Sequence, residues 1–434
     1  TSVVSGCEFF GSTEYAIVAH STESSLIVKD CSFSGCVVAL RSNGKLDVSS
    51  SELRDCMTAL TAREIRTTDS TIESCESAIL VKENNSLQAR DCNFRNCTEE
   101  IIEVNSGADI TIAGCNFSGG LKHAIRLEDT TTVRVLGCHF KDNRNDVKLI
   151  ESSAEFSDCV FDSPTNYSLG TIRADKVILR NCTFSGSTKC ALTCAYTDIE
   201  IYDCKANLKS SVLTTVTNTT MLIVRSNLTH SGPTDYSFIT AYFDQYPGDN
   251  EKNTLTMKDC TVSGAVVGIE SKKSYIDIEN CDFTRCGKGV LTRRSSTKIR
   301  GCSFRDCSIG VQIYNQADAR IENSTFTSCS DRGLLVDAAR PVIKDLKFRD
   351  CSTGLFLSQV TNSKPSGCDF DDCGNALALL DCSVEISDSS IRGGIGIRSA
   401  KSTLTLTNMT FESVGTGLMA KEVELTIKRS RFRN

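Results

Sequence analysis

The sequence predicts an all-β chain folded as a parallel β-solenoid, or β-helix, in which one short pattern of strands is stacked about twenty times. Two observations predict this fold. A Cys-x-Phe-x-x-Cys motif, written KDCSFSGC at 29–36, returns as RDCNFRNC at 90–97 and as RGCSFRDC at 300–307. Short runs that alternate apolar and polar residues flank each copy, and no segment keeps a helical period. The five prolines also suit a chain whose backbone donors are committed to strand pairing.

The motif returns at a nearly constant interval, and we call each copy a rung. Aligned on the first cysteine position, two residues before the phenylalanine, the intervals lie between 19 and 24 residues. One interval of 34 residues, between Ser226 and Cys260, is the exception. An average of about 22 residues is typical of solenoids. The aligned positions are Cys7, Cys31, Ser51, Ser70, Cys92, Cys115, Cys138, Cys159, Cys182, Cys204, Ser226, Cys260, Cys281, Cys302, Ser324, Leu346, Cys368, Ser389, Met409 and Ser430.

Each rung contains the same elements in the same order. An alternating run such as SSLIVKD predicts a strand with one face inward. An Asp, Asn or Gly follows just before the first cysteine position, where it tolerates the left-handed backbone of a tight bend. After the Cys-x-Phe step and a polar corner, a second alternating run begins with pairs such as Gly289-Val290 and Gly310-Val311.

This repeat resembles the right-handed parallel β-helix superfamily, the pectate-lyase-like fold, over essentially the whole chain. The resemblance implies one right-handed β-helix over residues 1–434, with an irregular insertion at 232–253. It says little about function, because that superfamily includes polysaccharide lyases and hydrolases, phage tailspikes and intracellular proteins without sugar chemistry.

The cysteines form two columns along the predicted solenoid. Twelve of the 24 occupy the first position of the motif and nine the second. In the first column cysteine alternates with serine, as at Ser51 and Ser70, and removing one member of a disulfide would leave its partner unpaired. We therefore interpret the columns as reduced thiols that act as small buried apolar groups, rather than as disulfides or zinc ligands. Free thiols in this number favour a reducing compartment, the cytoplasm.

A catalytic constellation is not evident in the sequence. The four histidines, His20, His123, His139 and His230, lie at unlike rung positions and are expected to be scattered over the surface. No phosphate-binding loop or compact metal motif is present, and we expect no cofactor and no metal.

One acidic corner leaves a question open. Asp369, Asp371 and Asp372 lie within one rung, and Asp350 is expected one rung away. Stacked carboxylates repel unless a cation or a proton intervenes, so a Ca²⁺ site there is one possibility and a solvated polar corner the other.

The composition argues against two classes of ligand. No tryptophan occurs and aromatic residues make up 6% of the chain, which counts against a long saccharide groove. The formal net charge is -6 and no strong basic field results, which makes nucleic acid an unlikely partner. Basic residues do recur two positions before the motif, but Glu279 and Glu322 interrupt them. No apolar run approaches the length that spans a bilayer, so we expect no membrane segment.

The insertion at 232–253 is the one place where the repetition fails, and it is rich in aromatic residues. Alternation would point Ile239 and Ala241 inward and Thr240 and Tyr242 outward. Inserted loops in solenoids often carry the binding surface. The predicted binding residues are Tyr236, Phe238, Tyr242, Phe243 and Tyr246.

These observations predict a non-catalytic scaffold that binds a protein partner or carries fused domains, as part of a larger intracellular protein. The alternative is a carbohydrate-active enzyme, a polysaccharide lyase or hydrolase, or a glycan-binding fibre. New reducing ends or unsaturated products from a polysaccharide would favour the alternative.

Overall fold

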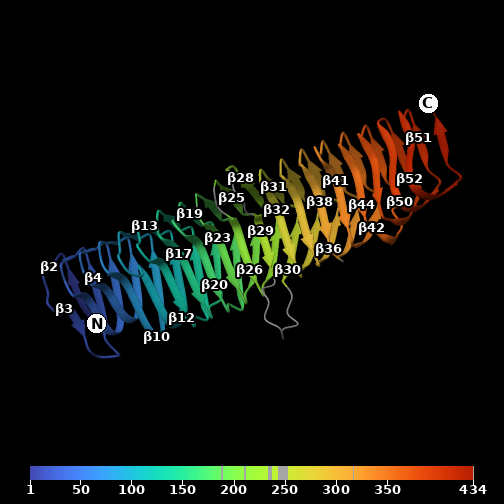
Figure 1. The fold of residues 1–434 in the computed structure, drawn as a ribbon. Coiled ribbons are helices and arrows are strands. Elements are labelled where there is room, and N and C mark those ends of the chain that lie inside the picture. Colours follow the sequence, from blue (N-terminus) through green and yellow to red (C-terminus); the bar gives the residue numbers. More distant parts are fainter. Residues whose placement is uncertain (187–188, 210–211, 233–236, 243–252, 316, 434) are drawn as a thin grey trace. The chain divides into compact units, whose positions relative to one another are not determined.

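A computed structural model of the chain describes residues 1–186, 189–209, 212–232, 237–242, 253–315 and 317–433. Every element in these ranges is a strand, so they hold no helix that could cross a membrane. The predicted fold class is confirmed: the strands pair in parallel, rung upon rung. The chain forms two compact units, Thr1–Thr214 (unit 1) and Thr215–Asn434 (unit 2), which we describe separately. Within each unit the colours of Figure 1 change gradually from one rung to the next, as sequential stacking requires.

Unit 1 builds each rung from three strand segments, which stack on their equivalents in neighbouring rungs. Stack A follows the second cysteine position and contains β3 (Tyr15–Ala19), β14 (His123–Glu128), β17 (Asn145–Ile150), β20 (Tyr167–Ile172) and β23 (Cys190–Ala195). Stack B precedes the first cysteine position and contains β1 (Ser2–Ser5), β4 (Ser25–Lys29), β15 (Thr132–Leu136), β18 (Ala154–Ser157), β21 (Lys176–Arg180) and β24 (Asp198–Tyr202). Four long strands bend and serve both stacks: β6 (Val38–Ser49), β8 (Thr58–Thr68), β10 (Ser77–Arg90) and β12 (Ile102–Ala113).

Stack C of unit 1 carries the motif phenylalanine. It contains β2 (Glu8–Phe10), β5 (Ser32–Ser34), β7 (Glu52–Arg54), β9 (Thr71–Glu73), β11 (Asn93–Arg95), β13 (Asn116–Ser118), β16 (His139–Lys141), β19 (Val160–Asp162), β22 (Thr183–Ser185) and β25 (Lys205–Leu208). The boundary between the two units falls within β26 (Val212–Thr217).

Unit 2 repeats the same three stacks. Stack A contains β29 (Ser237–Tyr242), β32 (Val267–Lys272), β35 (Lys288–Arg293), β38 (Ile309–Tyr314), β41 (Arg332–Asp337), β44 (Thr353–Ser358) and β47 (Asn375–Leu380). Stack B contains β27 (Thr220–Val224), β30 (Thr254–Lys258), β33 (Tyr275–Glu279), β36 (Ser296–Arg300), β39 (Asp318–Glu322), β42 (Arg340–Lys344), β45 (Thr361–Ser363) and β48 (Ser383–Ser387). The long strands are β50 (Ile395–Thr407) and β52 (Thr416–Lys428). Stack C contains β28 (Asn227–His230), β31 (Thr261–Ser263), β34 (Asp282–Thr284), β37 (Ser303–Arg305), β40 (Thr325–Thr327), β43 (Lys347–Arg349), β46 (Asp369–Asp371), β49 (Ser390–Arg392), β51 (Thr410–Glu412) and β53 (Arg431–Arg433).

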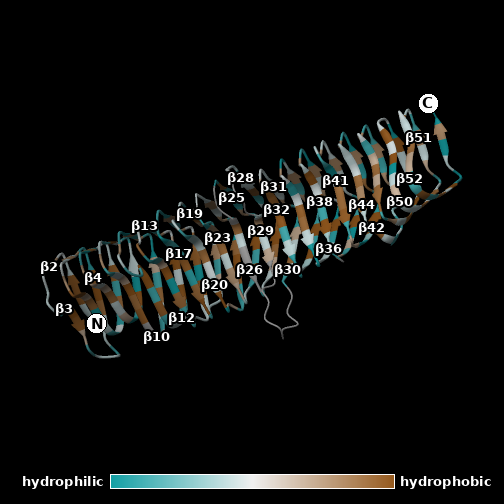
Figure 2. Ribbon diagram, in the orientation of Figure 1, coloured by the Kyte–Doolittle hydropathy of each residue, from teal (hydrophilic) through white to brown (hydrophobic). Residues whose placement is uncertain are grey.

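The core of each unit is a file of stacked side chains, because register keeps equivalent residues above one another. In unit 1 the rings of Phe94 and Phe117 lie 4.9 Å apart and nearly parallel, and Phe140 continues the file at the same spacing. In unit 2 Phe304 and Phe326 stack at 5.0 Å. Figure 2 shows hydrophobic and hydrophilic residues mixed along the strands, as expected where alternate side chains point inward and outward.

The first cysteine position performs one hydrogen-bonding task that either cysteine or serine can perform. The backbone N–H of Cys302 donates to Ser324 Oγ at 3.2 Å, and the N–H of Cys260 donates to Cys281 Sγ at 3.5 Å. In each pair the acceptor belongs to the next rung, which explains why the two residue types interchange along the column. Cys92, Cys115, Cys138, Cys159 and Cys182 are buried and form no disulfide in the structure, an arrangement that agrees with the predicted column of thiols.

The predicted turn residue before this position adopts the left-handed backbone. Asp30, Asp91, Asp259 and Asn280 have φ values of 52°, 54°, 53° and 53°. The sequence pattern therefore predicted both the bend and the residue types that tolerate it.

Candidate functional site

The structure describes only part of the predicted binding loop. Tyr236, Phe243 and Tyr246 and the side chain of Tyr242 lie outside the described residues. Phe238 is 1% exposed, and its ring packs edge-on against His230 with centroids 5.6 Å apart. Phe238 therefore supports the inside of its rung, and a binding surface at 232–253 stays a prediction.

Alternation in β29 follows the expected pattern. Ile239 and Ala241 are fully buried, as expected of inward-facing residues. Thr240, at the outward position, is 9% exposed and is therefore largely covered. Alternation therefore predicts the burial of the inward residues of this strand correctly, but not that of the outward residue Thr240.

The acidic corner of unit 2 is interleaved with basic side chains. Register places Asp369 opposite Lys347, and Asp371 opposite Arg349 on one side and Arg392 on the other. Arg392 lies 3.7 Å from Asp371, and Ser390 Oγ donates to Asp369 at 2.5 Å. These cations relieve the repulsion expected between stacked carboxylates.

Asp350 and Asp372 are turn residues with positive φ, at 51° and 49°. No group of three or more metal-ligating side chains is found in the part of the chain that the structure describes. Nothing in this corner calls for a bound cation.

The outward basic residues of unit 2 belong to a column of alternating charge. Lys258, Glu279, Arg300, Glu322 and Lys344 are register partners on five successive strands of stack B. Lys258 and Glu279 form an ion pair of 3.3 Å. A column in which the sign changes at each rung does not present the continuous positive potential that a phosphate backbone requires.

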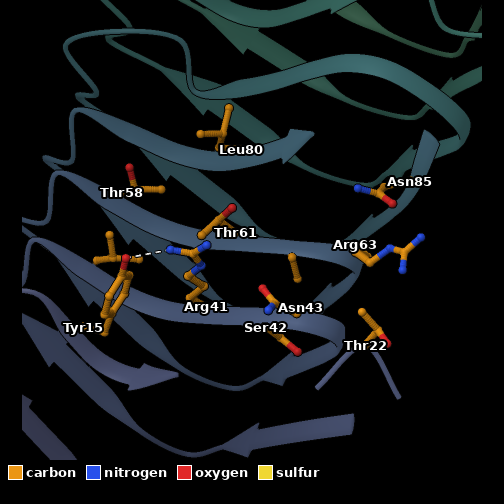
Figure 3. Close-up of a pocket in the computed structure, with 12 residues that line it drawn as sticks. Tyr15, Thr22, Arg41, Ser42, Asn43, Thr58, Thr61, Arg63, Leu80 and Asn85 are labelled. Carbon is orange, nitrogen blue, oxygen red and sulfur yellow. Dashed lines mark hydrogen bonds between the residues drawn. The ribbon is translucent and has the colours of Figure 1, made fainter. Parts of the chain in front are cut away.

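An open groove lies on the outer side of stack A in unit 1, as Figure 3 shows. It encloses about 460 Å³, and its lining includes Tyr15, Arg41, Thr61 and Leu80 from four neighbouring strands. Arg41 directly follows the buried Leu40 and therefore points to the outside. The groove was not predicted from the sequence.

Unequal bend lengths explain why the surface is sunken here. Between the paired residues on either side of the bend, β6 has Asn43 and Gly44 where β8 has only Arg63. On the other side of β8, β10 has residues 81–85 where β8 has residues 62–63. Since the bend of β8 is shorter than both of its neighbours, a hollow forms over it.

Close backbone packing fixes the bend of β6. A Cβ atom on Gly44 would lie 2.2 Å from the carbonyl oxygen of Ser24, so only glycine fits. The N–H of Lys45 donates to that same carbonyl at 2.8 Å, and Asn43 Nδ2 donates to the carbonyl of His20 at 2.7 Å. The groove is therefore built on a bend with defined geometry.

The groove carries positive charge without internal compensation. Arg41 Nη1 donates to the hydroxyl of Tyr15 at 2.6 Å, and the guanidinium lies over the Tyr15 ring, 5.3 Å from its centroid. Figure 3 marks this hydrogen bond. Neither Arg41 nor Arg63 forms an ion pair with any of the described residues. At the rim, by contrast, Lys45 and Glu64 pair at 2.8 Å.

A second polar cluster lies on stack A of the same unit. His123 and Tyr167 occupy the same strand position two rungs apart, with Asn145 between them. His123 Nε2 lies 3.1 Å from the Tyr167 hydroxyl, and His123 Nδ1 lies 3.5 Å from Glu100 Oε1. Lys122 Nζ binds the other oxygen of Glu100 at 3.0 Å.

Burial and charge set the protonation of this cluster. Burial lowers the pKa of His123, opposed by Glu100, so the imidazole is neutral at pH 7. Burial alone would raise the pKa of Glu100, but the hydrogen bond and charge of Lys122 outweigh it and lower that pKa. Burial raises the pKa of Tyr167 to about 12. Tyr167 therefore keeps its proton at pH 7 and can donate a hydrogen bond to Nε2 of the neutral His123, whose other nitrogen faces a carboxylate.

The expectation of scattered surface histidines is wrong for two of the four. His230 is 3% exposed, and the His123 side chain is 12% exposed. Aligning the rungs position by position would have brought His123 and Tyr167 together, since they share one column. No comparable sequence pattern predicts the groove, because the groove depends on differences in bend length between neighbouring strands.

The chain belongs to the right-handed β-helix family. The model described as "Right handed beta helix region" matches residues 38–170, 147–297, 248–391 and 288–432. This confirms the suspected superfamily. The model described as "Adenovirus EB1 55K protein / large t-antigen" matches residues 1–71 only. No curated protein matches the chain.

Solved structures similar to this chain include enzymes and an adhesin. The PL6-family alginate lyase AlyGC is 9% identical, with 99% of this chain and 97% of that chain covered and a TM-score of 0.32. The adhesin PfbA of Streptococcus pneumoniae is 10% identical, with 86% and 85% covered and a TM-score of 0.23. The family 28 exopolygalacturonase of Yersinia enterocolitica is 7% identical, with 90% and 72% covered and a TM-score of 0.22. Similarities this low carry no argument about function.

Proposed function

We propose that this β-helix is a non-catalytic interaction module whose contact surface is the groove of unit 1. The observation that carries the proposal is the pair of arginines, Arg41 and Arg63, which lie in one hollow without an ion-pair partner in the described ranges. Rigid strands hold the hollow, and a guanidinium group without a counter-ion is suited to binding an anionic group of another molecule.

The module is proposed to act in the cytoplasm, within a larger protein. The support is the thiol chemistry of the core: the buried free cysteines Cys138, Cys159 and Cys182 lie at successive positions of one column. Cysteines in this arrangement suit a compartment that keeps thiols reduced.

A second candidate is a carbohydrate-active enzyme, and the His123–Tyr167 hydrogen bond favours it. A neutral imidazole beside a protonated phenol is a proton acceptor beside a proton donor. Arg126 lies on the same strand as His123 and is held by Glu103 at 2.8 Å, and Glu128 also binds it. Acidic and basic groups are thus held next to the His123–Tyr167 pair.

One assay separates the two candidates. The purified chain is incubated with acidic and neutral polysaccharides, with and without Ca²⁺, and the products are examined for reducing ends and unsaturated sugars. The interaction module predicts none. Arg134, an exposed residue of β15, provides the control variant. If products are formed by the chain and by Arg134→Gln but not by His123→Gln or Tyr167→Phe, the protein is an enzyme and the proposal of a non-catalytic module is wrong.

A further inference from the structure

We infer that the groove of unit 1 binds an extended acidic peptide segment of a partner protein, with carboxylates two residues apart. This inference rests on the proposed interaction function and adds the chemistry of the partner. It draws on the spacing of the two arginines, on the apolar part of the groove lining and on the state of the Tyr15 ring.

The arginine spacing matches an extended chain. Register pairs Arg41 with Thr61 on the neighbouring strand, and Arg63 lies two residues beyond Thr61. One strand spacing and two residues of rise place the two arginine Cα atoms roughly 8 Å apart. Side chains at i and i+2 of an extended peptide point the same way about 7 Å apart. Two such carboxylates therefore have about the same spacing as the Cα atoms of the two arginines.

The groove lining also offers apolar surface next to the arginines. Val38, Ala62 and Leu80 contribute apolar surface, and Thr58 and Thr61 add methyl and hydroxyl groups. An extended peptide that alternates acidic and aliphatic residues presents one kind of side chain to each face. When the carboxylates face the arginines, the residues between them face away from the groove, so the apolar surface is available to peptide residues before or after the acidic stretch.

The hollow continues past the bend, which gives the peptide a path. A second hollow of about 330 Å³ shares Arg63 with the first and reaches Lys45 and Glu64 on the far side of the bend. A ligand that follows both hollows passes Arg41 first and Arg63 next. Figure 3 shows the Arg41 side chain turned toward Tyr15 and the Arg63 side chain turned away from it, so a compact anion such as a single phosphate would not extend along both hollows.

The aromatic ring argues for a peptide over an acidic sugar chain. Saccharide chains usually stack on flat aromatic faces, but the described groove lining holds one aromatic residue, Tyr15, whose hydroxyl accepts a hydrogen bond from Arg41. Tyr15 thus orients Arg41, and its ring is the one that this lining offers for stacking. Binding in the groove therefore depends mainly on the recognition of carboxylates by the oriented guanidinium group of Arg41, which an acidic peptide satisfies.

The test measures fluorescence anisotropy of the labelled peptide Val-Glu-Val-Glu-Val-Glu with the full chain. We expect Arg41→Gln/Arg63→Gln to weaken binding about tenfold or more, because two charge-assisted contacts are lost. Arg134→Gln, an exposed arginine on β15 outside the groove lining, serves as the matched control and retains the affinity. Thermal unfolding of the variants is expected to be unchanged, since all three side chains are exposed.

Two further peptides test charge and spacing. Val-Gln-Val-Gln-Val-Gln lacks the carboxylates, and Val-Val-Glu-Glu-Glu-Val keeps their number but places them side by side. We expect both to bind more weakly. Equal binding of either peptide, unchanged binding by the double variant, or no binding of the acidic peptide would overturn the inference.

An oligogalacturonate probe distinguishes this inference from the proposed function. If the oligosaccharide binds more tightly than the peptide and the double variant abolishes that binding, the peptide inference fails while the groove remains an interaction surface. Cleavage of the oligosaccharide would instead show that the proposed non-catalytic function is wrong. The peptide inference would then still be decided by the anisotropy measurements alone.

Discussion

Gly310 lies against the ring of Phe326, the motif phenylalanine of the next rung. A Cβ atom added to Gly310 would come within 2.6 Å of Cδ1 of Phe326 and within 2.6 Å of the carbonyl oxygen of Gly333. Gly333 stands in the same relationship to Phe348, at 2.7 Å. The Gly-aliphatic pair and the Cys-x-Phe step, which look like separate features of the repeat, are therefore two sides of one contact.

Gly310→Ala is expected to destabilise unit 2. The added methyl group must displace either a backbone carbonyl or a ring inside a stacked file, and such overpacking costs about 1–3 kcal/mol. Urea unfolding measures the change. Gly415→Ala is the matched control, because the nearest atom to its Cβ is 3.4 Å away, and it is expected to be neutral. Equal stability of the two variants would contradict this prediction, because it would show that the stacked phenylalanine rings can shift to accept a methyl group at little cost.

Cys281→Ser is expected to be tolerated, and Cys281→Ala is not. Serine can accept the N–H of Cys260, as Ser324 accepts that of Cys302, whereas alanine leaves a buried donor without an acceptor. An unsatisfied buried donor costs about 1–3 kcal/mol. Comparing unfolding midpoints of the two variants isolates the hydrogen bond, since both remove the thiol. If serine proved as harmful as alanine, the sulfur itself would be required.

Asp146→Asn is expected to stabilise unit 1 at pH 8. Asp146 is fully buried; Asn143 Nδ2 donates to its Oδ1 at 3.0 Å, and Oδ2 has no hydrogen-bond partner among the described atoms. Burial raises the pKa of Asp146 well above its ordinary value. The folded state therefore holds the proton more tightly, and the stability this provides is lost as pH rises through the folded-state pKa.

Urea unfolding at pH 4 and pH 8 tests this pH dependence. The advantage of Asp146→Asn should grow with pH, because only the aspartate has to lose a proton in a buried site. Loss of stability in Asp146→Asn at pH 8 would indicate that a buried cation or another positive group compensates the carboxylate.

Thiol titration is expected to separate the native from the unfolded protein. Burial raises the pKa of Cys97 to about 11 and that of Cys368 to about 12, so these thiols react slowly in the folded chain. Under denaturing, non-reducing conditions all 24 cysteines should titrate. A small number of free thiols in the unfolded chain would contradict the proposed cytoplasmic location.

The fold was predictable because each rung repeats the same local sequence pattern. Turn residues such as Asp91, the inward Phe94 and the Gly310 position recur at fixed offsets, and alternation assigns every strand an inner face. Signals of this kind need only short-range pattern and a period.

The candidate sites were not predictable in the same way. The groove depends on the bend of β8 at Arg63 being shorter than the bends of β6 and β10, which is a difference between three strands and not a property of any one of them. Asp146 stands where the rungs before and after carry Ala124 and Ser168, so a column-by-column reading could have singled it out as an exception. His123 and Tyr167 needed the same reading across two rungs.

The bend of β8 has a consequence for engineering. Because a rung in a solenoid contacts only its immediate neighbours, trimming a bend alters the local surface without disturbing distant rungs. If the bend of another long strand were shortened to the length of the β8 bend and an arginine were placed there, we expect a similar hollow to form at the new position. The architecture thus provides a template on which recognition sites can be added one at a time.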